Sequence, residues 1–456
     1  MSMQLVLPQM SAPAERAGAA RGEAARDPGS EETGSPPHGN ERTGSALLRA
    51  ALRRENLQAA FKRVRGNKGA AGVDDLDIDQ TARHLVAAWP AIREELLAGT
   101  YRPSPVRRVM IPKPDGSQRE LGIPTVTDRL IQQALLQVLQ PLLDPTFSEH
   151  SYGFRPGRRA HDAVLAAQSY VQSGCRIVVD VDLEKFFDRV NHDILIDRLR
   201  KRTPDAGVIR LIRAYLNSGI MDGGVAMERH EGTPQGGPLS PLLANVMLDE
   251  VDKELERRGH YFVRYADDCN VYVRSRRAGE RVMNLLRRLY ARLRLRVNET
   301  KSAVTSVLTD RKFLGYSFWV APKGVIKRRV ATKALATFKQ RVRELTRRSG
   351  GRSMQDVVDR LRTYLLGWAG YFRLSQSKIL WQTLDEWIRH RLRAAQLKQW
   401  KRGPTIFREL RALGAAPWLA QKVAGNSRRW WRNSAKSLNG VLTLKYFDDL
   451  RLPRLS

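Results

Sequence analysis

The stretch from Tyr261 to Val273, YFVRYADDCNVYV, constrains the fold of this chain most. Two short runs rich in Tyr, Phe and Val flank a polar break, and this pattern is typical of a β-hairpin. The break carries two adjacent carboxylates, Asp267 and Asp268. Carboxylates at the edge of a sheet offer the hard oxygen ligands that Mg²⁺ prefers. Asp is also common in turns for backbone reasons alone, so the pair by itself indicates either a solvated turn or a metal site.

A second strand can supply a third carboxylate. Residues 175–182, CRIVVDVD, read as a buried strand that ends in acids. Because side chains alternate along a strand, Asp180 and Asp182 lie on one face, and Val179 and Val181 lie on the other. Asp182 stands at the exit of the strand, where it can join the acids of the hairpin.

The net charge is +32, from 79 Lys and Arg against 47 Asp and Glu. Such an excess predicts a polyanionic partner, with nucleic acid as the first candidate. Membrane surfaces are also anionic, but we find no apolar run long enough to span a bilayer and no secretory signal, which favours a soluble, cytoplasmic protein. The two cysteines, Cys175 and Cys269, form no CxxC pair, which excludes a Cys-ligated zinc finger and a disulfide framework.

The first part of the chain combines a tail with a basic hairpin. Residues 1–45 have almost no aromatic or β-branched side chains, which predicts disorder. Helices are expected near 45–61, 79–98 and 127–143, with a hairpin over 106–125 between the last two. Lys113 and Arg119 flank the turn of that hairpin. They are either two solvated cations or a clamp for a triphosphate.

A loop rich in Gly and Pro, EGTPQGG, leads into an apolar helical run within residues 231–249. Gly236 and Gly237 carry no side chain that would obstruct a base pair. Taken alone, such a cluster of Gly and Pro is more often a structural turn followed by a helix cap.

Most of the excess charge lies in the last third of the chain. Residues 321–456 hold 31 Lys and Arg against 8 Asp and Glu, a net charge of +23. Ala331, Leu335, Phe338, Val342 and Leu345 follow helical spacing, so that stripe indicates core, and the basic residues outside it remain for phosphate. The RRWWR run at 428–432 suits stacking on bases or a small hydrophobic cluster.

Taken together, these blocks resemble the group II intron reverse transcriptase and maturase family over roughly residues 50–456. The blocks that carry the resemblance are NKGAAGVD, the IPKPDG and RELGIPT hairpin, SYGFRPGRRAHDA, DVDLEKFFD, GTPQGGPLSPLLANVMLDE, YADD, NETK, FLGYSFW and LLGWAGYFR. Their order makes the resemblance far more specific than YADD alone.

The resemblance implies an α+β right-hand polymerase followed by an all-α region. Fingers and an antiparallel-sheet palm are expected over 46–320, and a helical thumb that doubles as the maturase domain over 321–415. Residues 416–456 are then a short basic region that can bind DNA. The zinc-bearing nuclease domain of some relatives is expected to be absent, because fewer than 40 residues and no cysteine follow Trp418.

The resemblance also implies a set of site residues. Asp182, Asp267 and Asp268 are expected to be catalytic and to bind two Mg²⁺ ions, with Mn²⁺ as a substitute, whereas Asp180, Asp188 and Asp193 are expected to be solvated or capping residues. An aromatic ring at Phe187 would clash with a ribose 2′-hydroxyl and so select deoxynucleotides. The other implied nucleotide contacts are Lys113, Arg119, Gln235 and Lys301, the template–primer contacts are Gly236 and Gly237, and the RNA contacts are Lys339, Arg341, Arg343, Arg362 and Arg373.

The implied function is RNA-directed DNA synthesis together with help in splicing the parent intron. The implied partners are group II intron RNA, an RNA template with a DNA primer, a DNA target and dNTPs, in a bacterial-type cytoplasm with association to the nucleoid. Insertion would be primed by the cut target or by a nascent strand. The alternatives are an RNA-binding splicing factor whose polymerase activity is incidental, and a domesticated reverse transcriptase in phage defence or DNA repair. Glu184 departs from the family pattern, which commonly has a basic residue there.

Overall fold

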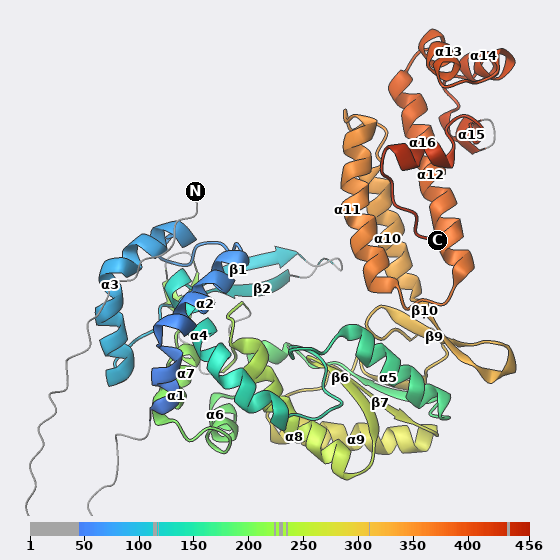
Figure 1. Cartoon of the computed structure of the whole chain (residues 1–456). Helices are drawn as coiled ribbons and strands as arrows, with labels where there is room; N and C mark the ends of the chain where they lie inside the picture. Colours follow the sequence, from blue (N-terminus) through green and yellow to red (C-terminus); the bar gives the residue numbers. More distant parts are fainter. Residues whose placement is uncertain are drawn as a thin grey trace, which may run out of the picture.

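A computed structural model describes residues 45–456, apart from 113–115, 117, 223–224, 228–230, 234–235, 310 and 436–437. The predicted tail, Lys113 and Gln235 therefore lie outside the described residues. Figure 1 shows a helical and hairpin region at one end, a central sheet covered by helices, and a group of helices that stands beside the sheet. Within the described residues, no helix is both long and apolar enough to cross a membrane.

The first region combines four helices with a hairpin. Its elements are α1 Ala46–Ala51, α2 Arg54–Gly66, α3 Ile78–Ala98, β1 Val106–Pro112, β2 Gln118–Ile123 and α4 Val126–Leu143. The Asp77 side chain accepts from the backbone of Gln80 in a capping box, and α3 ends at Gly99 in a left-handed conformation. The predicted helices and hairpin are confirmed here. The hairpin extends into a four-stranded sheet with the order β2-β1-β4-β5, in which β4 is Ile220–Asp222 and β5 is Val225–Met227.

The central sheet has the strand order β6-β7-β3-β8. Its strands are β3 Ile177–Val181, β6 Tyr261–Tyr265, β7 Asp268–Val273 and β8 Ala303–Ser306, and its helices are α5 Ala160–Gln172, α8 Ser240–Arg257 and α9 Arg276–Arg292. Helices α8 and α9 lie on one side of β6 and β7, and α5 lies on the other (Figure 1). Strand alternation separates two cores, because Val179 and Val181 pack with α8 and α9, whereas Val178 packs with α5.

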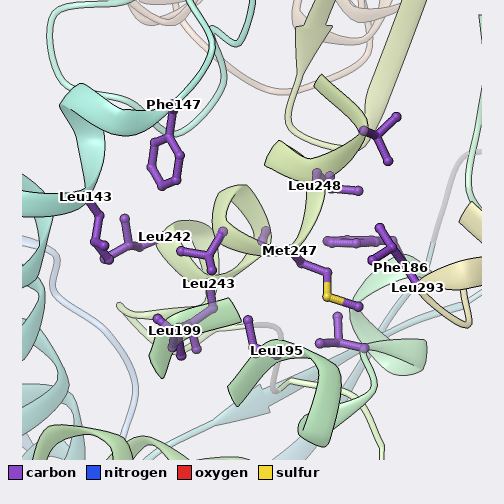
Figure 2. Close-up of a cluster of buried hydrophobic side chains, with 14 of the residues drawn as sticks. Leu143, Phe147, Phe186, Leu195, Leu199, Leu242, Leu243, Met247, Leu248 and Leu293 are labelled. Carbon is purple, nitrogen blue, oxygen red and sulfur yellow. The ribbon is translucent and has the colours of Figure 1, made fainter. Parts of the chain in front are cut away.

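The larger core surrounds α8. Figure 2 shows Leu242, Leu243 and Met247 of this helix among apolar side chains from several other elements. These include Leu143 at the end of α4, Phe147 after the 3-10 turn Asp144–Thr146, Phe186 of the 3-10 turn Phe186–Arg189, and Leu195 and Leu199 of α6 His192–Arg200. Helix α7 Ala206–Leu216 contributes to the same core. Phe186 is buried in this core. Because the core holds Phe186, it also fixes the short turn in which the neighbouring Phe187 stands.

The C-terminal region is helical but starts later than expected. β9 Tyr316–Val320 pairs with β10 Ile326–Val330, so the expected boundary at 320 falls inside a hairpin and the expectation of an all-α region from residue 321 is wrong at its start. Helices follow from Thr332. They are α10 Thr332–Leu345, α11 Met354–Phe372, α12 Lys378–Trp400, α13 Gly403–Ala412, α14 Pro417–Gly425, α15 Trp430–Ala435 and α16 Leu444–Asp449.

One core joins all of these helices. Phe338 and Val342 of the predicted stripe are buried against α11 and α12, as the stripe predicts. Residues after 416 contribute Val423, Leu442 and Phe447 to the same core. The described residues after 416 thus continue the packing of α10–α13. The backbone N–H groups of Leu455 and Ser456 donate to the Asp385 carboxylate.

Candidate active site

The central sheet brings three carboxylates to one of its ends. In the hairpin, Tyr265 pairs with Asp268, which leaves Ala266 and Asp267 to form the turn. Ala266 has a φ of 58°, an unusual left-handed conformation for a residue other than glycine. On the next strand, Val181 lies opposite Cys269. Asp182 follows Val181, so the antiparallel register carries it beside Asp268.

The NETK segment holds the end of β3 in place. The Asp182 backbone N–H donates to Ser302 Oγ at 3.0 Å, and its carbonyl accepts from the Asn298 N–H at 2.8 Å. Lys301 Nζ lies 3.5 Å from Asp182 Oδ2. This segment therefore fixes the backbone of Asp182 and also places a cation beside its carboxylate.

Burial and mutual repulsion raise the pKa values of the hairpin acids. Burial is the largest cause for Asp268, followed by the charges of Asp267, Asp180 and Asp182, and together they raise its pKa to about 6. Asp268 keeps one side exposed to solvent. Burial and Asp182 also raise the pKa of Asp267, against the charges of Arg119 and Arg264. A cation bound between these groups would relieve the repulsion.

A buried arginine supports the turn from the face of the sheet that carries α8 and α9. Arg264 is 1% exposed and donates to both carboxylate oxygens of Asp252, at 2.6 to 2.9 Å. It also donates to Asn245 Oδ1, to Ser151 Oγ and to the carbonyl of Ala266. The side chain thus ties the turn to α8 and to the SYGFR segment. Sequence reasoning missed Arg264, because a single Arg in a strand carries no signal of burial.

The predicted nucleotide contacts that the structure describes share one groove. Arg119, Phe187 and Lys301 line it together with Asp182 and Asp267. Phe187 is half-buried and meets Phe186 edge to face, with ring centroids 5.1 Å apart. The carbonyl of Phe187 accepts from the N–H of Thr233 at 2.7 Å, which joins its turn to the GTPQGG loop.

The two glycines of that loop have a packing reason for their identity. Gly236 has a φ of 142°, and a Cβ there would lie 2.5 Å from the Gly122 carbonyl oxygen of β2. A Cβ at Gly237 would lie 2.5 Å from the side-chain oxygen of Gln132 on α4. The loop therefore lies against β2 and α4 at distances that only glycine allows. A template–primer contact at Gly236 and Gly237 stays a prediction.

A second groove opens on the other side of Asp182. It is lined by Asp180, Asp182 and Asp268 and by four cations, namely Lys301, Arg311, Lys312 and Lys333. Asp180 pairs with Arg311 Nε at 2.6 Å, and burial raises its pKa despite that partner. The expectation of a solvated Asp180 is therefore wrong, because the pairing of β3 with β7 and β8 encloses it. Asp193, by contrast, is exposed and pairs with Arg213 on the surface.

The donor set suits a hard divalent cation in its chemistry. Asp182, Asp267 and Asp268 offer only carboxylate oxygens, the ligands that Mg²⁺ and Mn²⁺ prefer. Among the described residues, no three His, Cys, Asp or Glu side chains stand close enough together to hold a metal ion as they are placed. Asp182 is paired with Lys301 instead. Binding a cation would thus require Lys301 to release Asp182 and the carboxylates to turn toward one another.

The predicted RNA contacts lie on two neighbouring helices. Lys339, Arg341 and Arg343 belong to α10, Arg362 belongs to α11, and Arg373 follows its last turn. Arg341 pairs with Glu344 at 2.9 Å, and Arg343 lies over the Trp387 ring, 5.8 Å from its centroid. Some of these cations are thus already engaged within the protein. No structural feature separates them from the other cations of this region.

Two segments of the chain match known protein families. Residues 111–318 match the reverse transcriptase (RNA-dependent DNA polymerase) family, which in general uses divalent metal ions, and residues 335–414 match the group II intron, maturase-specific domain. The two matched segments follow each other in the order that the sequence blocks predict.

Several curated proteins are similar to the chain. Protein YkfC of Escherichia coli (strain K12) is 38% identical over 218 residues, which cover 46% of this chain and 57% of that protein. Group II intron-encoded protein LtrA of Lactococcus lactis subsp. cremoris is 29% identical over 350 residues, covering 62% of this chain and 58% of that protein. The putative COX1/OXI3 intron 2 protein of Saccharomyces cerevisiae is 30% identical over 205 residues, covering 44% and 24%. The chain thus spans little more than half the length of the first two relatives.

Proposed function

We propose that this chain, which belongs to the group II intron-encoded reverse transcriptase and maturase family, is an RNA-directed DNA polymerase that also binds its intron RNA to assist splicing and mobility. One observation carries the polymerase assignment: Asp182 and Asp267 line one groove at the end of the sheet, and Arg119, Phe187 and Lys301 line the same groove. A solvated acidic turn would not need these partners.

Each of these residues has a separate role in nucleotide addition. Asp182, Asp267 and Asp268 would hold the two Mg²⁺ ions. When bound, such a pair of ions activates the primer 3′-hydroxyl and stabilises the leaving pyrophosphate. Arg119, with Lys113, neutralises the triphosphate, and Lys301 lies near the incoming nucleotide. The ring of Phe187 excludes a 2′-hydroxyl and so selects dNTPs.

The finer architecture belongs to the same proposal. Residues 46–320 act as fingers and palm, and residues 321–415, which are helical from Thr332 onward, act as thumb and maturase domain. Gln235, Gly236 and Gly237 contact template and primer. Residues 321–456, with a net charge of +23, bind intron RNA, and the segment after 416 contacts the DNA target. These partners place the protein in a bacterial-type cytoplasm, near the nucleoid. Mobility then proceeds from a primer on the cut target or on a nascent strand.

Primer extension tests the polymerase assignment. Purified protein should extend a DNA primer on an RNA template with dNTPs and Mg²⁺, and Asp267→Ala should lower the rate by about three orders of magnitude or more. Asp193→Ala is the matched control, because Asp193 is an exposed carboxylate outside both grooves. Extension by Asp267→Ala at the rate of the control would contradict the assignment.

Splicing tests the second half of the proposal. The intron RNA that encodes the chain should splice at moderate salt only when the protein is added, and Asp267→Ala should retain this effect, because the metal-binding acids lie outside the helical region. Protein that extends primers but leaves splicing unchanged would limit the function to reverse transcription and favour a domesticated enzyme. Protein that aids splicing but extends no primer would favour a splicing factor.

A further inference from the structure

One short segment accounts for almost all of the net positive charge of the first 320 residues. These residues carry a net charge of +9, and residues 274–296 alone carry +8, from nine Arg and one Glu. All nine arginines are exposed. Without this segment, the remainder of the first 320 residues would be close to neutral. Such a concentration is unlike the spread of charge that solubility requires.

Helix α9 contains six of these arginines, all of them exposed. Its inner side buries Val282, Leu286 and Tyr290 against the sheet and α8. Arg277, Arg281 and Arg288 follow one another at spacings of four and seven residues, which places them on one stripe along the opposite side. We call these three residues the α9 arginine stripe. At a rise of about 1.5 Å per residue, the stripe is roughly 16 Å long.

The guanidinium groups of the stripe are available to a ligand. Arg277, Arg281 and Arg288 have no hydrogen bond or ion pair with any residue that the structure describes. The neighbouring Arg287 differs, because it pairs with Glu299 at 2.7 Å. Free cations crowded on one helix face repel each other, so an anion that bridges them is favoured.

A groove runs beside the stripe. It is lined by Arg281 and Arg288 of the stripe, by Arg258 and His260 at the end of α8, and by the apolar side chains Val282 and Leu285. Burial and the charge of Arg258 lower the pKa of His260, so its ring is neutral at neutral pH. The groove therefore offers guanidinium groups on its rim and no carboxylate in its lining.

This surface is separate from the polymerase groove. Asp180, Asp182 and Asp268 lie on the face of the sheet that carries α5, because their strand positions alternate with Val179, Val181 and Cys269, which pack toward α8 and α9. Figure 1 shows α9 on the opposite side of the strands from α5. A primer–template held at the acids thus has the sheet and a helix between itself and the stripe.

We propose that the α9 arginine stripe and its groove bind the phosphate backbone of a double-helical segment of RNA, held at the same time as the primer–template. This inference rests on the proposed function only in taking RNA as the partner. A duplex fits better than a single strand, because single strands are held by stacking on aromatic rings, and the one aromatic side chain of α9, Tyr290, is buried. Duplex DNA offers the same phosphates and is distinguished by experiment.

The test removes the stripe in the full-length protein. The triple substitution Arg277→Gln, Arg281→Gln and Arg288→Gln keeps good helix formers on an exposed face, so the fold should be retained. Binding of a labelled RNA hairpin with a long paired stem should weaken about tenfold or more at moderate salt. The slope of log K against log salt should fall by about 3, near one per lost phosphate contact. Primer extension should stay within about twofold.

Two controls accompany the triple variant. Lys201→Gln, Lys253→Gln and Arg257→Gln together change the net charge equally, at exposed cations already paired with acids. Replacing the three arginines of the stripe by lysines should restore most of the affinity, because Lys also binds phosphate. If the triple Gln variant does not fold, the triple Lys variant still tests the proposal. RNA binding and a salt slope equal to those of the charge control would overturn the proposal.

The remaining arms separate the possible partners. A DNA stem of the same sequence is measured in parallel, and a loss confined to DNA would overturn RNA as the partner. A loss on the RNA stem, with or without a loss on DNA, is the expected result. If the wild-type protein extends no primer, the proposed function fails while the binding result stands. If extension is normal and stem binding is unchanged in the triple variant, only the present inference fails.

Discussion

On one face of the central sheet, three carboxylates are crowded at the ends of β3 and β7, and burial together with the charges of neighbouring carboxylates raises the pKa of Asp268 to about 6. On the other face, α9 spreads nine exposed arginines along and beside one helix, with a single Glu among them. The acid face holds few charges, each partly buried and coupled to the others. The arginine face holds many charges, each in solvent and nearly independent.

This difference predicts how each face responds to substitution. Partly buried, coupled charges interact through a medium of low effective dielectric constant, so that one change has a large effect. Exposed charges are screened within about 8 to 10 Å, so that each contributes little and many are needed. We therefore expect single changes near the acids to have large effects and single changes on α9 to have small, additive effects.

The largest effect is expected at Arg264, which supports the acid face from below. Arg264→Met would leave Asp252 buried without its partner, and would leave Asn245, Ser151 and the Ala266 carbonyl without a donor. The expected loss is about 3–5 kcal/mol in the free energy of unfolding, measured by urea denaturation. The double variant Arg264→Met with Asp252→Leu should regain much of that stability, because no unpaired charge stays buried.

The double variant also separates positioning from stability. With the fold restored but the Ala266 carbonyl no longer held, the Mg²⁺ concentration for half-maximal primer extension should rise by about fivefold or more. Arg389→Met is the control, because Arg389 forms a similarly buried pair with Asp385 in the C-terminal region. It should lower stability and leave the Mg²⁺ dependence unchanged. Equal Mg²⁺ dependence in the double variant and wild type would show that Arg264 is only structural.

How far the site follows from sequence depends on the range of its contacts. The hairpin of Asp267 and Asp268 is local, and strand alternation with a central turn predicts it. Asp182 joins them only through the pairing of β3 with β7, across more than eighty residues, so residue patterns alone leave its partner open. The order of the family blocks supplied that link.

Long-range partners explain the errors as well. Asp180 was expected to be solvated, but Arg311, far along the chain, pairs with it. Arg264 gave no signal, because its burial depends on Asp252 of α8 packing beneath β6. The sequence predicts a helix that contains the arginines of α9, but it does not show that this helix covers the face of the sheet opposite the acids. In each case the missing information was which elements lie side by side.

The next largest effect is expected at Phe187, in the same groove as the acids. Phe187→Ala would remove the ring that we propose excludes a 2′-hydroxyl, while leaving Phe186 in the core. The preference for dNTP over rNTP, measured as the ratio of kcat/KM values, should fall about 10- to 100-fold. Phe187→Tyr keeps the ring and should keep the preference. An unchanged ratio in Phe187→Ala would remove Phe187 from the nucleotide site.

Replacing Asp268 is expected to have a smaller effect, and it should raise the stability of the protein instead of lowering it. Its pKa in the folded protein, about 6, lies above the ordinary value, so the folded state binds its proton more tightly than the unfolded state. This contribution to stability is complete at low pH and is lost as pH rises through about 6. At pH near 7.5 without divalent cations, Asp268→Asn should therefore raise the Tm by about 1 to 3 °C, after allowance for solvent screening.

The pH and metal dependence identify the cause of that gain. The difference in Tm should shrink as the pH falls below about 6 and should vanish only below about 3.8, where Asp268 is protonated in the unfolded state as well as in the folded state. Added Mg²⁺ should raise the Tm of the wild type but not that of Asp268→Asn. Asp193→Asn, which removes an exposed carboxylate paired with Arg213, should give no gain. A gain at Asp268 that persists unchanged near pH 5 would mean that repulsion is not its source.

The smallest effects are expected on α9, and their additivity is the informative quantity. Arg281→Gln alone should weaken binding of the RNA hairpin about twofold and lower the salt slope by about 1, because one screened phosphate contact is lost. Arg288→Gln should do the same, and the double variant should show the product of the two factors. Strong coupling between these variants would mean that the arginines act together in the groove, as the acids do on the opposite face. Additive small losses would instead establish that this face binds through many independent contacts, so that its affinity survives the loss of any single one.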